Sequence, residues 1–153
     1  MTKPFTIENA KQRERLGSLA RSLTDGELAL TLYPEGWTVA VALAHLGFWD
    51  ARRLMLVRKW RREGVAPSPI DEDVVNDALL LFLLAIPPRK AADLALATAE
   101  ALDRSLERLP EDMITAIDAL GDPHALDRSI HRRTHLDEID ALVSAERAAR
   151  KAS

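Results

Sequence analysis

Three features of the sequence predict an all-α fold. Apolar residues recur every three or four positions along most of the 153 residues, as they do on one face of a helix. Clusters of β-branched residues are few, and no Asn-Gly or Asp-Gly pair joins two alternating segments, so no strands are expected. Prolines and glycines interrupt the periodic segments at intervals typical of helix connections. We therefore expect a four-helix bundle with additional short helices, forming one domain over residues 1–153.

Caps and helix breakers set the expected boundaries of these helices. Thr6 and Thr38 are placed to cap the first and third helices. Gly64 and the prolines at 67 and 69 end the third helix. The helices are expected over residues 6–23, 25–32, 38–63, 71–86, 89–109, 111–120 and 124–149.

Composition excludes several classes of protein. With 47% hydrophobic and 29% charged residues, the chain is neither disordered nor fibrous. The formal net charge of -3 gives no field that would attract nucleic acid or anionic lipid. The N-terminus lacks the apolar core of a signal peptide, and the longest apolar run, 78–88, is too short to span a bilayer. We expect a cytoplasmic protein with no nucleic-acid or membrane partner. Because cysteine is absent, any metal must be held by nitrogen or oxygen.

Three histidines are spaced to hold one divalent metal ion. His131 and His135 lie four residues apart on the last helix, so both imidazoles project from one face. A catalytic metal site commonly uses three protein ligands and an open position, and His45 on another long helix is the natural third ligand. Their ligating nitrogens should then lie roughly 3 to 3.5 Å apart. Metal affinity should fall as the pH drops through the histidine range near 6.

Other interpretations of these residues remain open. His45 alone could be a hydrogen-bonded core residue. Arg132 and Arg133, which lie between the other two histidines, could mark a solvated basic face. His124 precedes His131 by seven residues, about 10 Å along a helix, and is better read as a residue at the start of the helix.

Three further residues could line a pocket near the histidines. Trp49 lies one turn after His45, although tryptophan at helical spacing is more often part of a core. Asp73 and Asn76 could reach a ligand, but we interpret them as capping and solvent-facing residues.

Two motifs carry a resemblance to a known family. Gly36-Trp37-Thr38-Val39 is followed by Leu43-Ala44-His45-Leu46, and His131, His135 and Ile139 share one face of the last helix. Together these segments resemble the DinB/YfiT-like family of four-helix-bundle proteins, which includes the N-terminal domain of mycothiol-dependent maleylpyruvate isomerase. The resemblance covers nearly the whole chain.

This resemblance implies a site in which His45, His131 and His135 hold nickel or zinc, with water completing the coordination. It also implies a low-molecular-weight thiol cofactor such as mycothiol or bacillithiol. The substrate-side groups of the isomerase are not carried over, because no further domain is expected after the last helix. Asp137 and Glu138 depart from the family pattern. Either could support or assist the metal site, but we interpret both as part of a solvated face.

Two functions compete on this basis. The leading hypothesis is a metal-dependent enzyme of the thiol-transferase or hydrolase type that acts on a small molecule. The alternative is a non-enzymatic, stress-related binding or scaffold bundle whose metal site is structural or vestigial.

The expected helix over residues 71–86 predicts a homodimer. Its apolar residues are too many and too widely distributed around the helix to face one core. These residues are Val74, Val75, Leu79, Leu81, Phe82, Leu83, Leu84 and Ile86.

Overall fold

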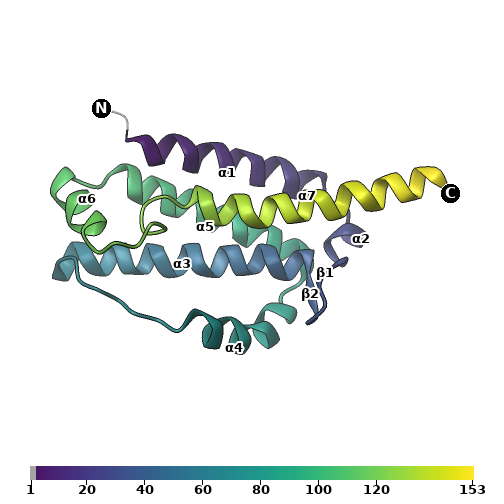
Figure 1. The fold of residues 1–153 in the computed structure, drawn as a ribbon, viewed down its shortest axis with the longest axis horizontal. Coiled ribbons are helices and arrows are strands. Elements are labelled where there is room, and N and C mark those ends of the chain that lie inside the picture. The colour runs from purple at the N-terminus through teal and green to yellow at the C-terminus, as the bar shows by residue number, and fades with distance from the viewer. Residues whose placement is uncertain (1–2) are drawn as a thin grey trace.

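A computed structural model describes residues 3–153, which are mostly helical (Figure 1). Within those residues the helices are α1 (Pro4–Ser22), α2 (Asp25–Leu28), α3 (Val39–Glu63), α4 (Glu72–Leu84), α5 (Pro88–Glu107), α6 (Glu111–Asp118) and α7 (Ser129–Ala152). The all-α prediction is confirmed. Most helix boundaries differ from the expected ones by one to four residues, as is usual where helix ends fray.

The four long helices α1, α3, α5 and α7 lie side by side (Figure 1). The closest packing is between α3 and α5, where small residues let the two backbones approach each other. A methyl group on Gly47 would lie only 3.4 Å from the Cα atom of Ala95. Ala91, Ala92 and Ala99 extend the buried face of α5. This close approach fixes α3, and therefore His45, against the centre of the molecule.

A short antiparallel hairpin contradicts the expectation that the chain has no strands. Strand β1 (Thr31–Tyr33) pairs with β2 (Trp37–Thr38). The short helix α2 consequently ends at Leu28, four residues earlier than expected. Gly36 lies in the turn with φ of 92°, a conformation that favours glycine, and this reversal lets the two strands pair. Thr38 then caps α3 as predicted, its Oγ1 accepting a hydrogen bond from the Val41 N–H at 3.1 Å.

The starts of α1 and α7 also differ from the sequence predictions. Helix α1 begins at Pro4, since proline suits the first helical position, and Thr6 is inside the helix rather than its cap. Helix α7 begins at Ser129, five residues later than expected. Here the Asn9 side chain of α1 accepts hydrogen bonds from the backbone N–H groups of Arg128 (2.8 Å) and Ser129 (3.0 Å). A residue more than one hundred positions away in the sequence thus caps this helix.

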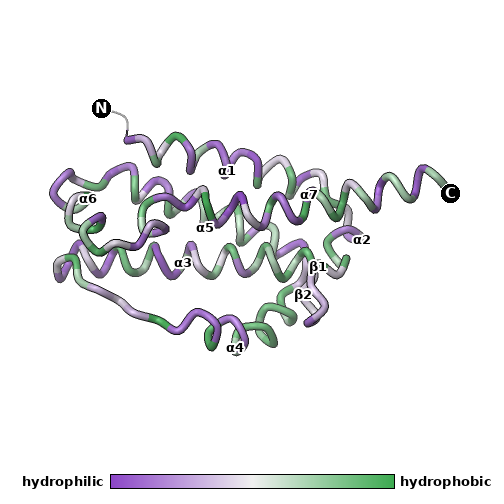
Figure 2. The backbone as a smooth tube through the Cα atoms, viewed as in Figure 1, coloured by the Kyte–Doolittle hydropathy of each residue, from purple (hydrophilic) through white to green (hydrophobic). Residues whose placement is uncertain are grey.

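Helix α4 packs on the others less completely. Its N-cap is Asp71, which was expected to be the first residue of the helix and whose side chain accepts a hydrogen bond from the Val74 N–H. The second half of α4 is strongly hydrophobic (Figure 2), yet among its residues only Leu83 is buried. No helix in residues 3–153 is long and apolar enough to cross a membrane.

Candidate metal centre

The structure brings His45, His131 and His135 together between α3 and α7. His45 lies two turns into α3 and is only 5% exposed. His131 and His135 project from adjacent turns of α7 toward it. One ring nitrogen from each histidine can be chosen so that all three lie within 4.8 Å of one another. Convergence from two helices follows the sequence prediction.

The three imidazole rings have nearly equal spacing. Their centroids are separated by 5.1 Å between His45 and His131, 4.9 Å between His45 and His135, and 5.0 Å between His131 and His135. The ring planes cross at 69° to 81°. The Nε2 atoms of His45 and His131 are 3.1 Å apart, within the range of roughly 3 to 3.5 Å expected for two nitrogens on one ion. The rings are steeply inclined to one another, and the nitrogen of His135 lies within 4.8 Å of the other two.

The outer nitrogen of His135 has a partner that suits a metal ligand. Tyr33 on β1 donates its phenol proton to the Glu138 carboxylate, and the phenol oxygen lies 3.2 Å from Nδ1 of His135. Because the phenol oxygen is free to accept a hydrogen bond, it favours a proton on Nδ1 and leaves the lone pair of Nε2 available. Burial, followed by Glu138, raises the pKa of Tyr33, so the phenol keeps its proton.

Glu138 therefore fits the expected solvated face only in part, because its side chain is 35% exposed while its carboxylate contacts the site through Tyr33. Its carboxylate is held by Tyr33 and lies 3.9 Å from the imidazole of His135. Asp137 does lie on the surface, where it pairs with Arg15 at 2.7 Å. The sequence offered no signal for Tyr33, because it reaches the site only through the unexpected hairpin.

His131 has a different outer partner. Nη2 of Arg128 lies 3.3 Å from Nδ1 of His131. Since a guanidinium can only donate, this contact favours a proton on Nε2 of His131, which then serves as donor to His45. Coordination through Nε2 of His131 requires this proton to leave and the contact with Arg128 to change. In the structure, His131 is therefore hydrogen-bonded to both His45 and Arg128.

His45 differs from His131 and His135, because its outer nitrogen has no partner. Its Nδ1 atom is buried and has no hydrogen-bond partner among the described residues. Buried polar atoms usually have partners, so this imidazole makes fewer interactions than it could. The donor set, three imidazole nitrogens without a thiolate, suits zinc or nickel. Two of the three histidines accordingly fit a metal-binding role as they stand, and His131 fits it after a change of tautomer.

Burial keeps these imidazoles neutral. It lowers the pKa of His45 to about 3, helped by the positive charge of Arg128 and by that of His135 whenever His135 is protonated, and the pKa of His131 to about 2. The pKa of His135 is also lowered by burial, although Glu138 opposes this shift. A neutral imidazole is the form that binds metal. Competition from protons therefore begins at a lower pH than the value near 6 expected from the sequence.

A buried ionic network lies directly behind the histidines. Arg132 is fully buried, contrary to its interpretation as part of a solvated basic face. Its guanidinium binds the carboxylates of Asp50 on α3 and Asp103 on α5, at 3.0 and 2.8 Å. Asp50 also accepts a hydrogen bond from Arg128 at 2.9 Å, and Asp103 from Arg13 at 2.7 Å. These ion pairs fix the position of α7 along α3, and with it the separation of the histidines.

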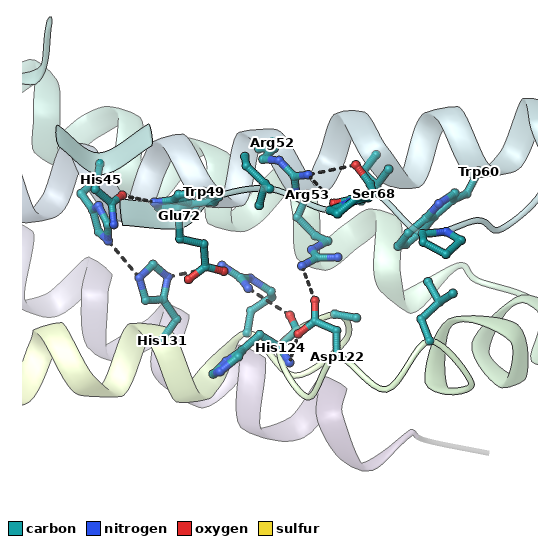
Figure 3. A pocket seen from close by; sticks show the side chains of 18 residues that line it. His45, Trp49, Arg52, Arg53, Trp60, Ser68, Glu72, Asp122, His124 and His131 are labelled. Atoms are coloured by element: carbon teal, nitrogen blue, oxygen red, sulfur yellow. Dashed lines mark hydrogen bonds and ion pairs between the residues drawn. The ribbon is translucent and has the colours of Figure 1, made fainter. Parts of the chain in front are cut away.

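A cleft of about 410 Å³ opens beside His45 and His131 (Figure 3). Trp49 lines it, and its indole N–H donates to Oδ1 of Asn76 at 3.0 Å. Asn76 is thus a cleft residue, and interpreting it as solvent-facing was wrong. Asp73 is exposed, as expected. His124 also lines the cleft, although it lies before α7 and not on it, and it does not belong to the three-histidine cluster.

No protein-family model, curated protein or solved structure matches this chain. The candidate site therefore has to be interpreted from its own geometry.

Proposed function

We propose that this chain is a metal-dependent enzyme of the thiol-transferase or hydrolase type, in which His45, His131 and His135 hold one zinc or nickel ion. The observation that carries the proposal is the convergence of three imidazoles, two of which, those of His45 and His131, line an open cleft. A catalytic metal site keeps a coordination position open to water or substrate, whereas a structural site is closed by protein ligands. Three protein donors with a cleft beside two of them match a catalytic site, because one coordination position can stay open.

The family part of the proposal rests on sequence motifs and helix arrangement. Four long helices lying side by side, with histidines on two of them, agree with a four-helix bundle of the DinB/YfiT-like kind. That resemblance is also the reason for proposing mycothiol or bacillithiol as a thiol cofactor. A small molecule is the expected substrate, because the cleft has the size of a small-molecule site.

Different residues of this chain would bind the ion, orient its ligands and line the cleft. A bound divalent ion lowers the pKa of water or of a thiol, which makes a nucleophile available near neutral pH. His45 and His131 present their Nε2 atoms at the cleft end. Tyr33 and Glu138 orient His135 from behind. Trp49 forms part of the cleft wall beside His45, with the two ring centroids 6.3 Å apart.

Metal analysis of untagged protein tests this proposal. We expect about one zinc or nickel ion per chain, and a sharp loss of metal when any one of the three histidines is replaced by alanine. His124→Ala is the matched control, because this histidine lines the same cleft without belonging to the cluster. A thiol-conjugation screen against a panel of electrophiles, followed by an ester and amide hydrolysis screen, tests the activity. Full metal content in the triple alanine variant would disprove the site.

A non-enzymatic role is the second candidate, and one observation favours it. His131 makes hydrogen-bond contacts within the protein on both of its ring nitrogens, one with His45 and one with Arg128. A site that is merely structural would raise stability strongly when metal is added but would leave no open position. Azide binding to the metal-loaded protein, followed by electronic spectroscopy of the cobalt-substituted form, separates the two roles. A spectral change on adding azide favours the enzyme.

A further inference from the structure

The cleft beside the histidines follows one face of α3. His45, Trp49, Arg52, Leu56 and Trp60 all line it (Figure 3). Their spacing of three or four residues places them in a continuous stripe on the helix. With a rise of 1.5 Å per residue, the position of Arg52 lies about 10 Å along α3 from that of His45. A ligand of modest length can therefore contact both ends of this part of the cleft.

The stripe on α3 combines apolar side chains with the positive charge of Arg52. Trp49 presents its indole between the histidines and the guanidinium of Arg52, whose carbon lies 6.0 Å from the centre of the Trp49 ring. Trp60 and Leu56 continue the apolar surface. Aromatic side chains bind flat apolar groups over a large area with little loss of conformational freedom.

Three guanidinium groups line the cleft, and two of them are neutralised. Arg128 pairs with Asp50 at 2.9 Å, and Arg53 pairs with Asp122 at 2.8 Å. Arg52 has no carboxylate partner in residues 3–153. It donates only to the backbone oxygen and the hydroxyl of Ser68, at 3.1 and 3.0 Å, and both bonds use Nη2. The remaining N–H groups of Arg52 are free to bind an anion.

The lining carboxylate that could neutralise Arg52 is Glu72, since the other one, Asp122, is already paired with Arg53. Glu72 is exposed and is the first residue of α4, where the partial positive charge of the helix N-terminus favours an acidic side chain. No ion pair joins it to Arg52 in the described residues. Because Arg53 and Arg128 are already paired, Arg52 and Glu72 are the two lining charges, opposite in sign, that form no ion pair in the described residues.

We propose that this cleft binds a carboxylic acid with an apolar or aromatic body, whose carboxylate is held by Arg52 and whose body lies along Trp49 toward the histidines. Binding of the acid does not depend on the proposed function. Its role as the substrate of the metal site does rest on the proposed function. The N–H groups of Arg52 that Ser68 does not use lie on Nε and Nη1, and a charge-assisted hydrogen bond from either one to a carboxylate fixes the position of the charged end of the ligand. Arg52 is thus the residue that selects acids over neutral molecules of the same shape.

The test uses 3-phenylpropionate as probe, with 3-phenylpropanamide and inorganic phosphate as comparison ligands. Binding is measured by calorimetry and by the ¹H–¹⁵N resonances of the three tryptophan indoles, first in metal-free and then in metal-loaded protein. We expect the acid to bind and to shift the Trp49 resonance, while the Trp37 resonance moves less because Trp37 does not line the cleft. The amide and phosphate should bind at least about tenfold more weakly.

Two arginine variants isolate the role of Arg52. Arg52→Gln should weaken binding of the acid by about tenfold or more and leave binding of the amide unchanged. Arg61→Gln is the matched control, because Arg61 also lies on α3 and donates to a backbone oxygen, that of Ser105 at 3.2 Å, but outside the cleft. Equal affinity for acid and amide, or an unchanged affinity in Arg52→Gln, would overturn the inference.

Measurements on metal-free and metal-loaded protein distinguish a failure of this inference from a failure of the proposed function. Selective binding of the acid by protein that takes up no metal would support the anion site and refute the metal-dependent enzyme. Stoichiometric metal without selective binding of the acid would refute the anion site alone. Equal binding of phosphate and 3-phenylpropionate would also overturn it, because the apolar body would then contribute nothing.

Discussion

Tyr33 connects a carboxylate to a candidate metal ligand. The Tyr33 hydroxyl donates a hydrogen bond to Glu138, and the oxygen of that hydroxyl lies 3.2 Å from Nδ1 of His135. Partners of this kind fix the tautomer and the ring orientation of a metal-binding histidine.

We predict that Tyr33→Phe lowers metal affinity by about tenfold or more, since the phenol no longer accepts from Nδ1 of His135. Glu138→Gln should act in the same direction. Chelator competition measures both effects, and Asp137→Asn is the control, because this neighbouring carboxylate pairs only with Arg15 at the surface. Wild-type affinity in Tyr33→Phe, together with loss of metal in His135→Ala, would contradict the role given to Tyr33.

At the scale of the elements, the buried ion pairs hold α7 against α3 and α5. Asp50 has an exposed fraction of 2% and binds both Arg128 and Arg132, so it compensates the buried charge of Arg128 and shares that of Arg132 with Asp103. Removing one partner of a buried ion pair is costly, because the opposite charge stays out of contact with water.

Asp50→Asn should therefore lower the free energy of unfolding by about 3 to 5 kcal/mol. It should also weaken metal binding, since the position of His131 relative to His45 depends on the same contacts. Urea denaturation measures the first effect. Asp93→Asn, at an exposed position on α5, should change stability little. A loss below about 1 kcal/mol in Asp50→Asn would show that other contacts hold α7 in place.

At the scale of the whole molecule, the buried histidines predict how stability depends on pH. The unfolded chain protonates histidine near pH 6.5, whereas the folded pKa values of His45 and His131 are about 3 and about 2. Below pH 6.5 the unfolded state binds more protons than the folded state, so stability of the metal-free protein falls as the pH falls.

We expect the urea midpoint of metal-free protein to be lower at pH 5 than at pH 7. The triple alanine variant of the three histidines should lose most of this difference. Glu27, buried against Arg147 at 2.8 Å, has a pKa lowered from 4.5 to about 2, chiefly by that hydrogen bond. Its contribution is present above pH 4.5 and is lost only below that value. An equal midpoint at pH 5 and pH 7 would contradict the histidine assignment.

The association state is a further prediction at this scale. Four apolar residues of α4 remain exposed in the single chain: Val74 (62%), Leu81 (78%), Phe82 (73%) and Leu84 (49%). The homodimer expected from the sequence stays a prediction, and this face is where we expect the second copy to pack. Sedimentation at tens of micromolar should show dimers, and Phe82→Glu should shift the protein toward monomer. A wild-type protein that is monomeric at this concentration would refute the prediction.

The sequence by itself determined the helices and the pair of histidines on α7. Helical periodicity is a local property, and a spacing of four residues places His131 and His135 on one face of any helix. The family motif and the need for a third ligand selected His45. Thr38 was recognised as the cap of α3 for the same local reason, because its hydroxyl reaches a backbone N–H only three residues away.

Only the tertiary structure decided the contacts that surround these histidines. Arg132 reads as a surface residue in sequence, yet carboxylates from α3 and α5 bury it. Asn9 moves the start of α7 by five residues through hydrogen bonds across the fold, and Tyr33 reaches His135 across a sequence separation of 102 residues. Local patterns report which face of an element is apolar. They carry no information on which distant polar group satisfies a buried charge or an unpaired backbone N–H group, because those partners are set by how the helices pack.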